Sequence, residues 1–328
     1  MEGSAVRVDP ALAPLHRQDG SETLHLSDAG GLTQFGAYVE VLAPGARSSE
    51  RHWHSAEDEF LFVFSGTATV IDDDGAHLLF PGDACCWRHG EPNAHHVLNA
   101  GDVALRYLIL GSRVLGDICT YPDSGRRLVN SATRWQVEEA DGTILRQGDL
   151  PPHLLNLAPV WGRPWDGAAL PLILRADRRE WVTEDAYVHP ILGGGLGPYR
   201  HSVLGDLGGL SQFGVHLEEL PPGSRSSFRH WHAAEDEMIL MLEGEVVLIE
   251  DQETPLTQGD AACWPAGRAV GHQLHNRSAA PALYLTIGTR LTRDVIHYPD
   301  HDLITHKDGP ARAYTQADGT PRSKGEDK

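Results

Sequence analysis

The chain has 328 residues, with 46 Asp and Glu against 27 Lys and Arg and a formal net charge of −19. A chain of this length can form two domains that each bury their own core. The acidic balance argues against a nucleic-acid or anionic-membrane partner, because phosphate binding needs clustered Lys and Arg, and the sequence has no such cluster.

The sequence also predicts a cytoplasmic protein with a small-molecule partner. Residues 1–10 contain no apolar run that could serve as a signal peptide, and nowhere do eighteen apolar residues follow one another. A few cysteines in a chain of this length do not indicate a disulfide framework. We therefore expect reduced, mostly buried thiols at Cys85, Cys86, Cys119 and Cys263.

Short apolar blocks alternate with turn residues in the first half of the chain. The blocks contain Val, Ile, Phe and Trp and occupy residues 38–42, 60–64, 67–71, 77–80, 84–87, 95–98 and 104–110. Gly, Pro and Asp separate them, as in Asp72-Asp73-Asp74-Gly75, which is typical of strands joined by tight turns. Since no long stretch with helical period intervenes, the pattern predicts an all-β antiparallel sandwich or barrel.

The second half of the chain repeats the first. The segment LTQFG at residues 32–36 returns as LSQFG at 210–214, and Tyr-Pro-Asp at 121–123 returns at 298–300. The offset is 178 residues from His52 to His230 and 177 from His95 to His272, so one residue is lost between them. Two long repeats indicate a duplicated domain rather than a solenoid. We predict an N-terminal domain at 20–145 and a C-terminal domain at 198–325.

A connector at residues 146–197 joins the two predicted domains. Prolines from Pro151 to Pro171 and the run of glycines at 193–195 interrupt the strand pattern there. The connector also holds Trp161, Trp165 and Trp181. So many aromatic residues do not suit a flexible tether, and we expect the connector to pack on the domains.

A set of candidate metal ligands occurs once in each half. Two histidines flank a tryptophan, so on a strand both imidazoles point to the same face. A bend around Ser55-Ala56 is needed to bring in the following acid, and a histidine from a distant strand supplies a fourth direction. The sets are His52, His54, Glu59 and His95 in the first half, and His230, His232, Glu237 and His272 in the second.

Three imidazoles and one carboxylate suit a divalent transition metal. Fe(II), Mn(II), Ni(II), Cu(II) and Zn(II) all accept such ligands, and four protein ligands leave one or two positions for water, oxygen or substrate. Ligand softness alone does not choose among these metals.

The spacing of these residues resembles the two motifs of the cupin superfamily. The first motif is a Gly, His-x-His, an acid and a second Gly, and it reads here as Gly45, His52, His54, Glu59 and Gly66, and again as Gly223, His230, His232, Glu237 and Gly244. The second motif is complete in the C-terminal half as Gly259, Asp260, Pro265, Gly267, His272 and Asn276. The N-terminal half matches it with Gly82, Asp83, Gly90, His95 and Asn99, but has Arg88 in place of the proline.

The chain resembles two-domain bicupins, such as bacterial cupin proteins of unassigned function. This resemblance implies two tandem double-stranded β-helix (jelly-roll) barrels and a bound metal. Three adjacent acids compete for the carboxylate position, and the family's spacing to the closing glycine selects Glu59 over Glu57 and Asp58. Because Pro265 and Gly267 fix the loop before His272, we expect the C-terminal site to be the better formed. His95 is then held less rigidly, or by polar contacts around Glu91 and Asn93.

A polar pair recurs on the strand that leads into each first motif, as Gln34 and Tyr38 in the first half and as Gln212 and His216 in the second. These residues could line a substrate pocket. Lining the pocket and lying on an exposed face are equally good interpretations of this pair. Tyr107 is kept in the second half as Tyr284. Arg106 and His96 are replaced there by Leu283 and Gln273, which suggests that the cavities of the two halves are no longer equivalent. The candidate pocket residues are Gln34, Tyr38, Tyr107, Gln212, His216 and Tyr284.

Apolar side chains occur on both faces of the strand that follows the first motif. Phe60, Phe62 and Phe64 share the face opposite Glu59, and the second half has Met238, Leu240 and Leu242 in their place. The outer face must therefore be covered, either by the other domain or by a second subunit of a homo-oligomer.

By analogy with enzymes of bicupin build, we expect a metal-dependent enzyme acting on a small oxygen-bearing organic substrate, of dioxygenase or decarboxylase type, which favours Fe(II). No nucleophile triad, phosphate loop or dinucleotide fingerprint competes for the chemistry. Two alternatives stay open. One is a non-enzymatic cupin that binds a small ligand, and the other is a metal-dependent lyase or isomerase.

Overall fold

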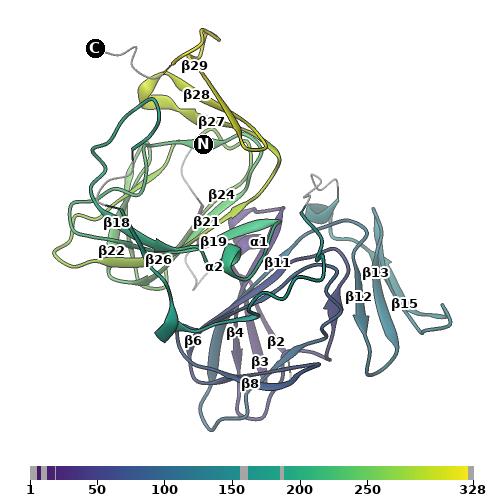
Figure 1. The fold of residues 1–328 in the computed structure, drawn as a ribbon. Coiled ribbons are helices and arrows are strands. Elements are labelled where there is room, and N and C mark those ends of the chain that lie inside the picture. The colour runs from purple at the N-terminus through teal and green to yellow at the C-terminus, as the bar shows by residue number, and fades with distance from the viewer. Residues whose placement is uncertain (1–5, 9–12, 19, 156–161, 185–187, 324–328) are drawn as a thin grey trace.

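The computed structural model describes residues 6–8, 13–18, 20–155, 162–184 and 188–323, which form two β-barrel domains (Figure 1). Strands pair antiparallel in both barrels, so the predicted all-β tandem fold is confirmed. In the part of the chain that is described, no helix is long and apolar enough to cross a membrane. All four cysteines are buried and unpaired.

The N-terminal barrel has three sheets, in the strand orders β16-β9-β6-β11-β4-β3-β2, β10-β7-β8 and β15-β14-β13-β12-β5. A short helix, α1 (Leu26–Gly30), precedes β4, and a 3-10 turn, η1 (Pro152–Leu154), follows β15. The strands are β2 (Leu15–Gln18), β3 (Ser21–His25), β4 (Phe35–Leu42), β5 (Trp53–His54), β6 (Glu59–Ser65), β7 (Ala68–Asp72), β8 (Gly75–Leu79), β9 (Ala84–Trp87), β10 (His96–Leu98), β11 (Leu105–Ser112), β12 (Ile118–Tyr121), β13 (Arg126–Asn130), β14 (Arg134–Glu138), β15 (Ile144–Asp149) and β16 (Ile173–Leu174).

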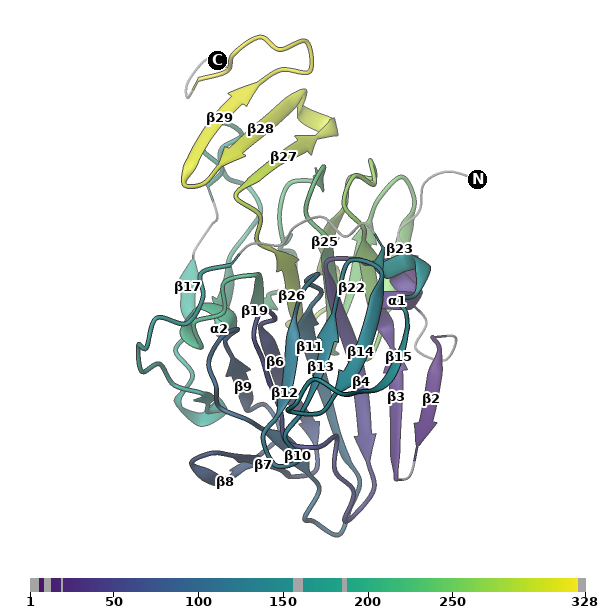
Figure 2. The same cartoon turned by 90° about the vertical axis from the view of Figure 1, so that its right-hand side faces the viewer.

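The C-terminal barrel repeats this plan with the orders β1-β24-β21-β26-β19-β18-β17, β23-β22-β25 and β20-β27-β28-β29 (Figure 2). It includes α2 (Leu204–Leu207) and η3 (Pro299–His301), and η2 (Ala176–Arg178) lies in the connector. The strands are β1 (Val6–Val8), β17 (Val182–Glu184), β18 (Tyr199–Ser202), β19 (Phe213–Leu220), β20 (Trp231–His232), β21 (Glu237–Glu243), β22 (Glu245–Ile249), β23 (Glu253–Thr257), β24 (Ala261–Trp264), β25 (Gln273–His275), β26 (Ala282–Thr289), β27 (Arg293–Tyr298), β28 (Leu303–Asp308) and β29 (Ala311–Thr315).

In the large sheet of each barrel, one edge strand comes from the segment that precedes the other barrel in the chain. β1, at the start of the chain, pairs with β24 of the C-terminal barrel, while β16 of the connector pairs with β9 of the N-terminal barrel. The connector also places Trp181 against the apolar core and beneath the Arg200 guanidinium, 4.5 Å from the ring centroid. The backbone N–H of Trp165 donates to the carbonyl of His89. Trp161 lies outside the described residues.

The outer faces of the two large sheets pack on each other. Alternate residues of β6 face opposite ways, so that Leu61 and Val63 lie in the N-terminal barrel core while Phe60 and Phe62 lie in an apolar cluster shared by both domains. Phe35 meets Phe213 across this interface with ring centroids 6.3 Å apart. The other domain therefore covers the apolar outer face, as one of the two interpretations of the sequence required.

Two buried aspartates connect the domains through hydrogen bonds. The Asp58 carboxylate accepts from the backbone N–H groups of Ser211 (2.7 Å) and Gln212 (2.9 Å) in the other domain, and from the backbone N–H and ring Nδ1 of His89. The same pattern runs in reverse, because the Asp236 carboxylate accepts from the backbone N–H groups at residues 33 and 34, at 2.7 and 2.8 Å. Each interface aspartate thus holds the backbone of the opposite barrel.

The placement of Gln34 and Gln212 in a substrate pocket is corrected by these contacts. Both side chains are buried at the domain interface. The Gln34 amide donates to the Ala234 carbonyl at 2.7 Å and accepts from the Asp236 backbone N–H at 3.0 Å. Gln212 makes the matching pair of hydrogen bonds with the other barrel. With their amides satisfied across the interface, both residues stabilise the domain pair.

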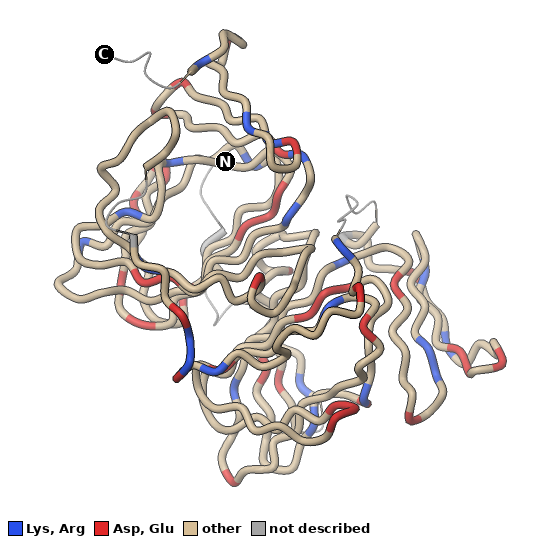
Figure 3. The backbone as a smooth tube through the Cα atoms, viewed as in Figure 1, with Lys and Arg blue, Asp and Glu red and all other residues tan. Residues whose placement is uncertain are grey.

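Charged residues of both signs are spread over the two barrels (Figure 3). Lys and Arg are scattered along the backbone rather than gathered in one stretch, and several of them pair with nearby acids, as Arg51 does with Asp73 and Asp123.

We predict that Asp58→Asn lowers the free energy of unfolding by about 2–3 kcal/mol, because an amide N–H₂ group then faces backbone donors that stay buried without an acceptor. Urea unfolding in the presence of a chelator measures this without a contribution from bound metal. Asp102→Asn, on an exposed loop, is the matched control and should be neutral. Equal stability of the two variants would show that the interface does not depend on this carboxylate.

Candidate metal centre

Four of the six histidines in the two candidate ligand sets are positioned by a short backbone pairing. His52 and His95 exchange two backbone hydrogen bonds, of 3.0 and 2.8 Å, which brings their ring centroids to 5.2 Å. His230 and His272 repeat this pairing with centroids 4.9 Å apart. The next histidine lies on β5 or β20 in register with the outer strand β12 or β27. The carboxylate ligand is the first residue of β6 or β21, after a break in the strand at residues 55–58 or 233–236, as the sequence required.

The ligand atoms are close enough for one ion to reach them. In the N-terminal set, the Glu59 carboxylate is 3.0 Å from His95 Nε2 and 3.9 Å from His54 Nε2. In the C-terminal set, one oxygen of Glu237 is 3.0, 3.9 and 3.7 Å from the Nε2 atoms of His272, His230 and His232, respectively. Ligands bound to one ion at about 2.0–2.2 Å lie roughly 3–4 Å apart. The ligand atoms of His52, Glu59 and His95 lie within 4.8 Å of one another, as do those of His230, His232 and Glu237, and these distances fit the dimensions of a metal centre.

Each imidazole is oriented through its other ring nitrogen. Nδ1 of His52 lies 2.9 Å from the carbonyl of Glu50, and Nδ1 of His95 lies 3.3 Å from the carbonyl of Asn93. These carbonyls can only accept, so Nδ1 carries the proton and the lone pair of Nε2 points to the centre. His230 and His272 have equivalent carbonyl partners.

A buried aspartate orients the remaining histidine of each set. Asp117 lies 2.7 Å from His54 Nδ1, and Asp294 lies 2.6 Å from His232 Nδ1. A carboxylate in this position fixes the ring and increases its basicity as a ligand. We did not find these two aspartates from the sequence, although they match each other at the repeat offset of 177 residues.

The electrostatics of the site fit a cation. Burial would raise the pKa of Glu59, but the neighbouring His54 and His95 outweigh it and hold that pKa below its usual range. Burial lowers the pKa of His230 to about 3, which keeps this ligand neutral. One carboxylate oxygen of Glu59, Oε2, is buried and lies 3.0 Å from His95 Nε2. A buried carboxylate beside three imidazoles is a ligand set that suits a divalent metal.

The three adjacent acids have three different environments. Glu59 belongs to the ligand set and Asp58 lies at the domain interface. Glu57 accepts from the backbone N–H of Val114 at 2.9 Å, and burial raises its pKa to about 8. Its counterpart Glu235 forms an ion pair with Lys307 at 2.6 Å. The register of β12 with β13 and of β27 with β28 places Asn130 where the C-terminal barrel has Lys307.

The loops that present His95 and His272 have the same turn. Gly90 and Gly267 adopt φ values of 78° and 77°, which favour glycine, and their N–H groups donate to the carbonyls of His54 and His232, both at 2.9 Å. Arg88, in place of the proline, forms an ion pair with Glu91 at 2.9 Å. Trp87 and Trp264 stack on the two histidines with ring centroids 3.8 Å apart. The loop is thus held by the polar contacts that we gave as the alternative to a looser site.

A cavity of about 380 Å³ opens at the N-terminal centre. Of the predicted pocket residues, Tyr38 and Tyr107 line it. Gly36 precedes Tyr38 by two residues on β4 and leaves room for the tyrosine ring, since a Cβ atom on residue 36 would lie 2.6 Å from that ring. The lining comprises Gly36, Tyr38, Glu40, Ser48, Ser49, His52, His54, Glu57, Glu59, Trp87, His95, His96, Val97, Tyr107, Ile109, Gly111, Ser112, Arg113, Asn130 and Leu154.

The two buried tyrosines each donate to a glutamate on the facing strand. Tyr107 donates to Glu40, and Tyr284 donates to Glu218 at 2.8 Å. Burial raises the pKa of Glu218 to about 7 and also raises that of Glu40. His216 takes the position of Tyr38 in the C-terminal barrel, with Nδ1 3.8 Å from Glu218. The two barrels therefore share the tyrosine–glutamate pair but differ at residues 38 and 216.

Replacing one ligand carboxylate should remove one metal. We predict that Glu59→Ala and Glu237→Ala each lower the metal content of the purified protein by about one ion per chain, since the carboxylate offsets the charge of the ion. Glu57→Ala is the matched control and should retain its metal. The measurement is elemental analysis of protein purified without added ions, and equal metal loss from the control would contradict our choice of ligand.

Replacing the aspartate behind His54 should weaken the N-terminal centre without removing a ligand. We predict that Asp117→Asn lowers metal affinity there by about 10–100-fold, because the imidazole loses its anionic partner. Competition with a chelator measures the affinity. Asp141→Asn, in the exposed turn between β14 and β15, is the control, and an unchanged affinity in Asp117→Asn would show that the carboxylate does not act through His54.

Comparisons with known proteins agree with the two-domain fold. The cupin domain model matches residues 38–111 and 216–288, while no curated protein matches the chain. A sugar phosphate isomerase of the cupin superfamily from Silicibacter pomeroyi is 40% identical over 48% of this chain and 97% of that chain, with a TM-score of 0.42. Oxalate decarboxylase from Lactobacillus farciminis is 16% identical over 96% of this chain and 89% of that chain, with a TM-score of 0.53. A putative glyoxylate induced protein from Pseudomonas aeruginosa is 14% identical over 83% and 82%, with a TM-score of 0.52. The last two show a shared fold, and with both motifs present in both halves, the chain belongs to the cupin superfamily as a two-domain bicupin.

Proposed function

We propose that this chain is a metal-dependent enzyme that acts on a small oxygen-bearing organic substrate, of dioxygenase or decarboxylase type, and that its N-terminal centre carries the reaction. The observation that carries the proposal is that His52, His54, Glu59 and His95 all line one cavity of about 380 Å³. That volume lies within the usual range for small-molecule sites.

The ligand set restricts the metal to a divalent transition ion. Such an ion, when bound, supplies a Lewis acid and a template for the substrate's oxygen atoms. We favour Fe(II), and Mn(II), Ni(II), Cu(II) and Zn(II) suit the same ligands. Four protein ligands would leave one or two positions of such an ion for substrate or oxygen.

Polar side chains in the cavity can hold the substrate's oxygen atoms. The Arg113 guanidinium donates to the Tyr38 hydroxyl at 3.0 Å and also to the Asp28 carboxylate. Because the Tyr38 oxygen already accepts this hydrogen bond, its own proton is available to a substrate oxygen. Asn130 adds an amide to the lining of the cavity. This arrangement supports binding of an oxygen-rich molecule over an apolar one.

The two barrels differ beside the centre in a way that favours the N-terminal one. Lys307 neutralises Glu235 in the C-terminal barrel, whereas the matching Glu57 faces its cavity with the neutral Asn130 nearby. A carboxyl group that no lysine or arginine neutralises can exchange a proton with substrate, while one held in a 2.6 Å ion pair with a lysine cannot do so without breaking the pair. Since the two histidine loops have the same turn, the difference in loop sequence gives no advantage to the C-terminal site.

We also propose that the protein works in the cytoplasm on a small-molecule substrate, without nucleic acid or membrane. The four unpaired, buried cysteines suit a reducing compartment, and the scattered Lys and Arg residues do not suit phosphate binding (Figure 3). A homo-oligomer is not required to cover the outer sheet faces, because each domain covers the other.

The reaction type is tested by oxygen uptake with a panel of small carboxylic, hydroxy and keto acids. We predict substrate-dependent turnover that is lost on metal removal. Turnover with oxygen uptake identifies a dioxygenase, and release of CO₂ without oxygen uptake identifies a decarboxylase. Conversion of substrate with neither would leave lyase or isomerase chemistry, and binding without conversion across the panel would contradict an enzyme.

The choice of centre is tested by a matched pair of variants. We predict that His95→Ala lowers kcat at least 100-fold, while His272→Ala keeps most of the activity of the protein. Metal content measured alongside should fall by about one ion in each variant, so that the pair differs in turnover and not in metal loss. The reverse result, with activity lost only in His272→Ala, would place the reaction in the C-terminal barrel.

A further inference from the structure

The same group of a histidine, a glutamate and an aspartate lies beside each candidate metal centre. The groups are His54, Glu57 and Asp117 in the N-terminal barrel, and His232, Glu235 and Asp294 in the C-terminal barrel. In each group, one nitrogen or oxygen atom from each residue lies within 4.8 Å of the other two. Both aspartate side chains are fully buried, and those of the two glutamates are 18% and 9% exposed. Two neighbouring carboxylates in such a place repel each other unless a cation lies beside them.

The C-terminal barrel supplies this cation from its own chain. Lys307 on β28 donates to the Glu235 carboxylate at 2.6 Å, and the lysine side chain is only 17% exposed. The two glutamates otherwise have matching partners. Glu235 accepts from the backbone N–H of Leu291 at 2.6 Å, and Glu57 accepts from that of Val114 at 2.9 Å. The lysine is therefore the main difference between two similar groups.

In the N-terminal barrel, an asparagine takes the place of this lysine. Asn130 precedes Lys307 by the repeat offset of 177 residues, and its backbone N–H donates to the carbonyl of Asp117 at 3.0 Å. Among the residues that the structure describes, no lysine or arginine lies within ion-pair distance of Glu57, and His54 Nδ1 lies 3.8 Å from it. Because a histidine that binds a metal is neutral, His54 does not replace the charge of the lysine.

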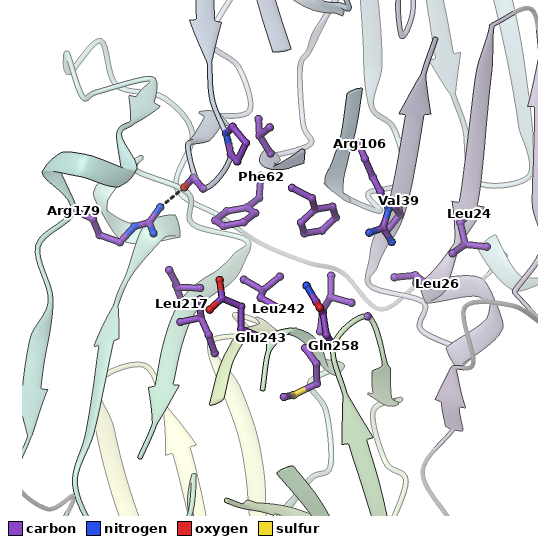
Figure 4. Close-up of a pocket in the computed structure, with 18 residues that line it drawn as sticks. Leu24, Leu26, Val39, Phe62, Arg106, Arg179, Leu217, Leu242, Glu243 and Gln258 are labelled. Atoms are coloured by element: carbon purple, nitrogen blue, oxygen red, sulfur yellow. Dashed lines mark hydrogen bonds between the residues drawn. The ribbon is translucent and has the colours of Figure 1, made fainter. Parts of the chain in front are cut away.

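The missing cation can come from the cavity. Glu57 and Asn130 both line the cavity at the N-terminal centre, together with all four candidate metal ligands of that barrel. Since asparagine is much shorter than lysine, a ligand can place its own ammonium where the other barrel places the Nζ atom of Lys307. The apolar gap between the barrels (Figure 4) shares no lining residue with this cavity and is not part of the site.

We propose that the N-terminal cavity binds a small molecule that carries an ammonium group as well as oxygen donors, and that Glu57 pairs with the ammonium. The inference rests on the proposed function, which places the substrate at this centre. The oxygen group lies at the metal centre, and the ammonium lies between Glu57 and the amide oxygen of Asn130. A small amino acid meets both requirements, whereas a simple carboxylic acid leaves Glu57 without a cation.

Glycine, β-alanine and 4-aminobutanoate are the probes, and the hydroxy acid of the same length is the control for each. Isothermal titration calorimetry on the metal-loaded full chain measures binding. At least one amino acid should bind about tenfold more tightly than its hydroxy acid, the usual gain from one charge-assisted hydrogen bond. The best chain length reports the separation of the metal and Glu57. Equal or weaker binding of all three amino acids would overturn the proposal.

An amine could also bind the metal itself, so two variants locate the ammonium. Asn130→Lys gives the N-terminal barrel the cation of the C-terminal barrel, and Glu57→Gln removes the charge with little change of shape. Each should weaken amino-acid binding by about tenfold and abolish the preference over the hydroxy acid. Metal content should stay at the wild-type value in both, because neither residue is a ligand. A preference that persists in either variant would place the amine elsewhere and overturn the proposal.

The binding measurements do not depend on turnover, so this inference and the proposed function can fail separately. Amino-acid preference that depends on Glu57, without conversion of any substrate, would support the ammonium site and contradict an enzyme. Turnover of hydroxy or keto acids, without any preference for an amino acid, would overturn the ammonium site and leave the proposed enzyme standing.

Discussion

The rest of the structure depends on the alternation of side chains over three consecutive acids, Glu57, Asp58 and Glu59. Glu57 and Glu59 point into the barrel, and Asp58 points out of it to the backbone of the other domain. The metal ligand and the main polar contact of the interface are therefore adjacent in the chain. A shift of one residue in this segment would exchange the two faces and lose the metal centre and the domain pairing at once.

Duplication explains why both barrels have a ligand set next to an interface aspartate. The differences between the barrels show which positions this arrangement leaves free to change. The ligand sets, the aspartates behind them and the interface contacts all recur. Positions that neither hold the metal nor join the domains have diverged: Asn130 corresponds to Lys307, and Arg106 to Leu283. Both changes alter the charge at the wall of a cavity. The scaffold is thus common to both halves, while the chemistry that each half can support is set by a few residues around it.

The strand period and the repeated motifs predicted the fold, and the eight candidate ligands that they indicated lie close together in two sets. The sequence did not predict the buried interface position of Gln34, because this residue precedes β4, which begins only at Phe35, and alternation predicts a face only within one continuous strand. It missed Asp117, whose role depends on a contact between two strands that lie more than sixty residues apart in the chain. Pairing across such a distance is decided by the folded barrel, and only the repeat offset pointed to it.

Strand β6 separates the two cavities of the N-terminal half. Glu59 at its start belongs to the metal centre, and Phe62 and Phe64 further along form one wall of the gap between the barrels. The gap between the barrels (Figure 4) therefore lies on the outer side of β6, and the metal centre lies on its inner side. Asp58, the residue before this strand, accepts hydrogen bonds from the backbone of the opposite barrel. The strand is thus constrained on both sides, by the ligand geometry inside the barrel and by the packing of the other domain outside it.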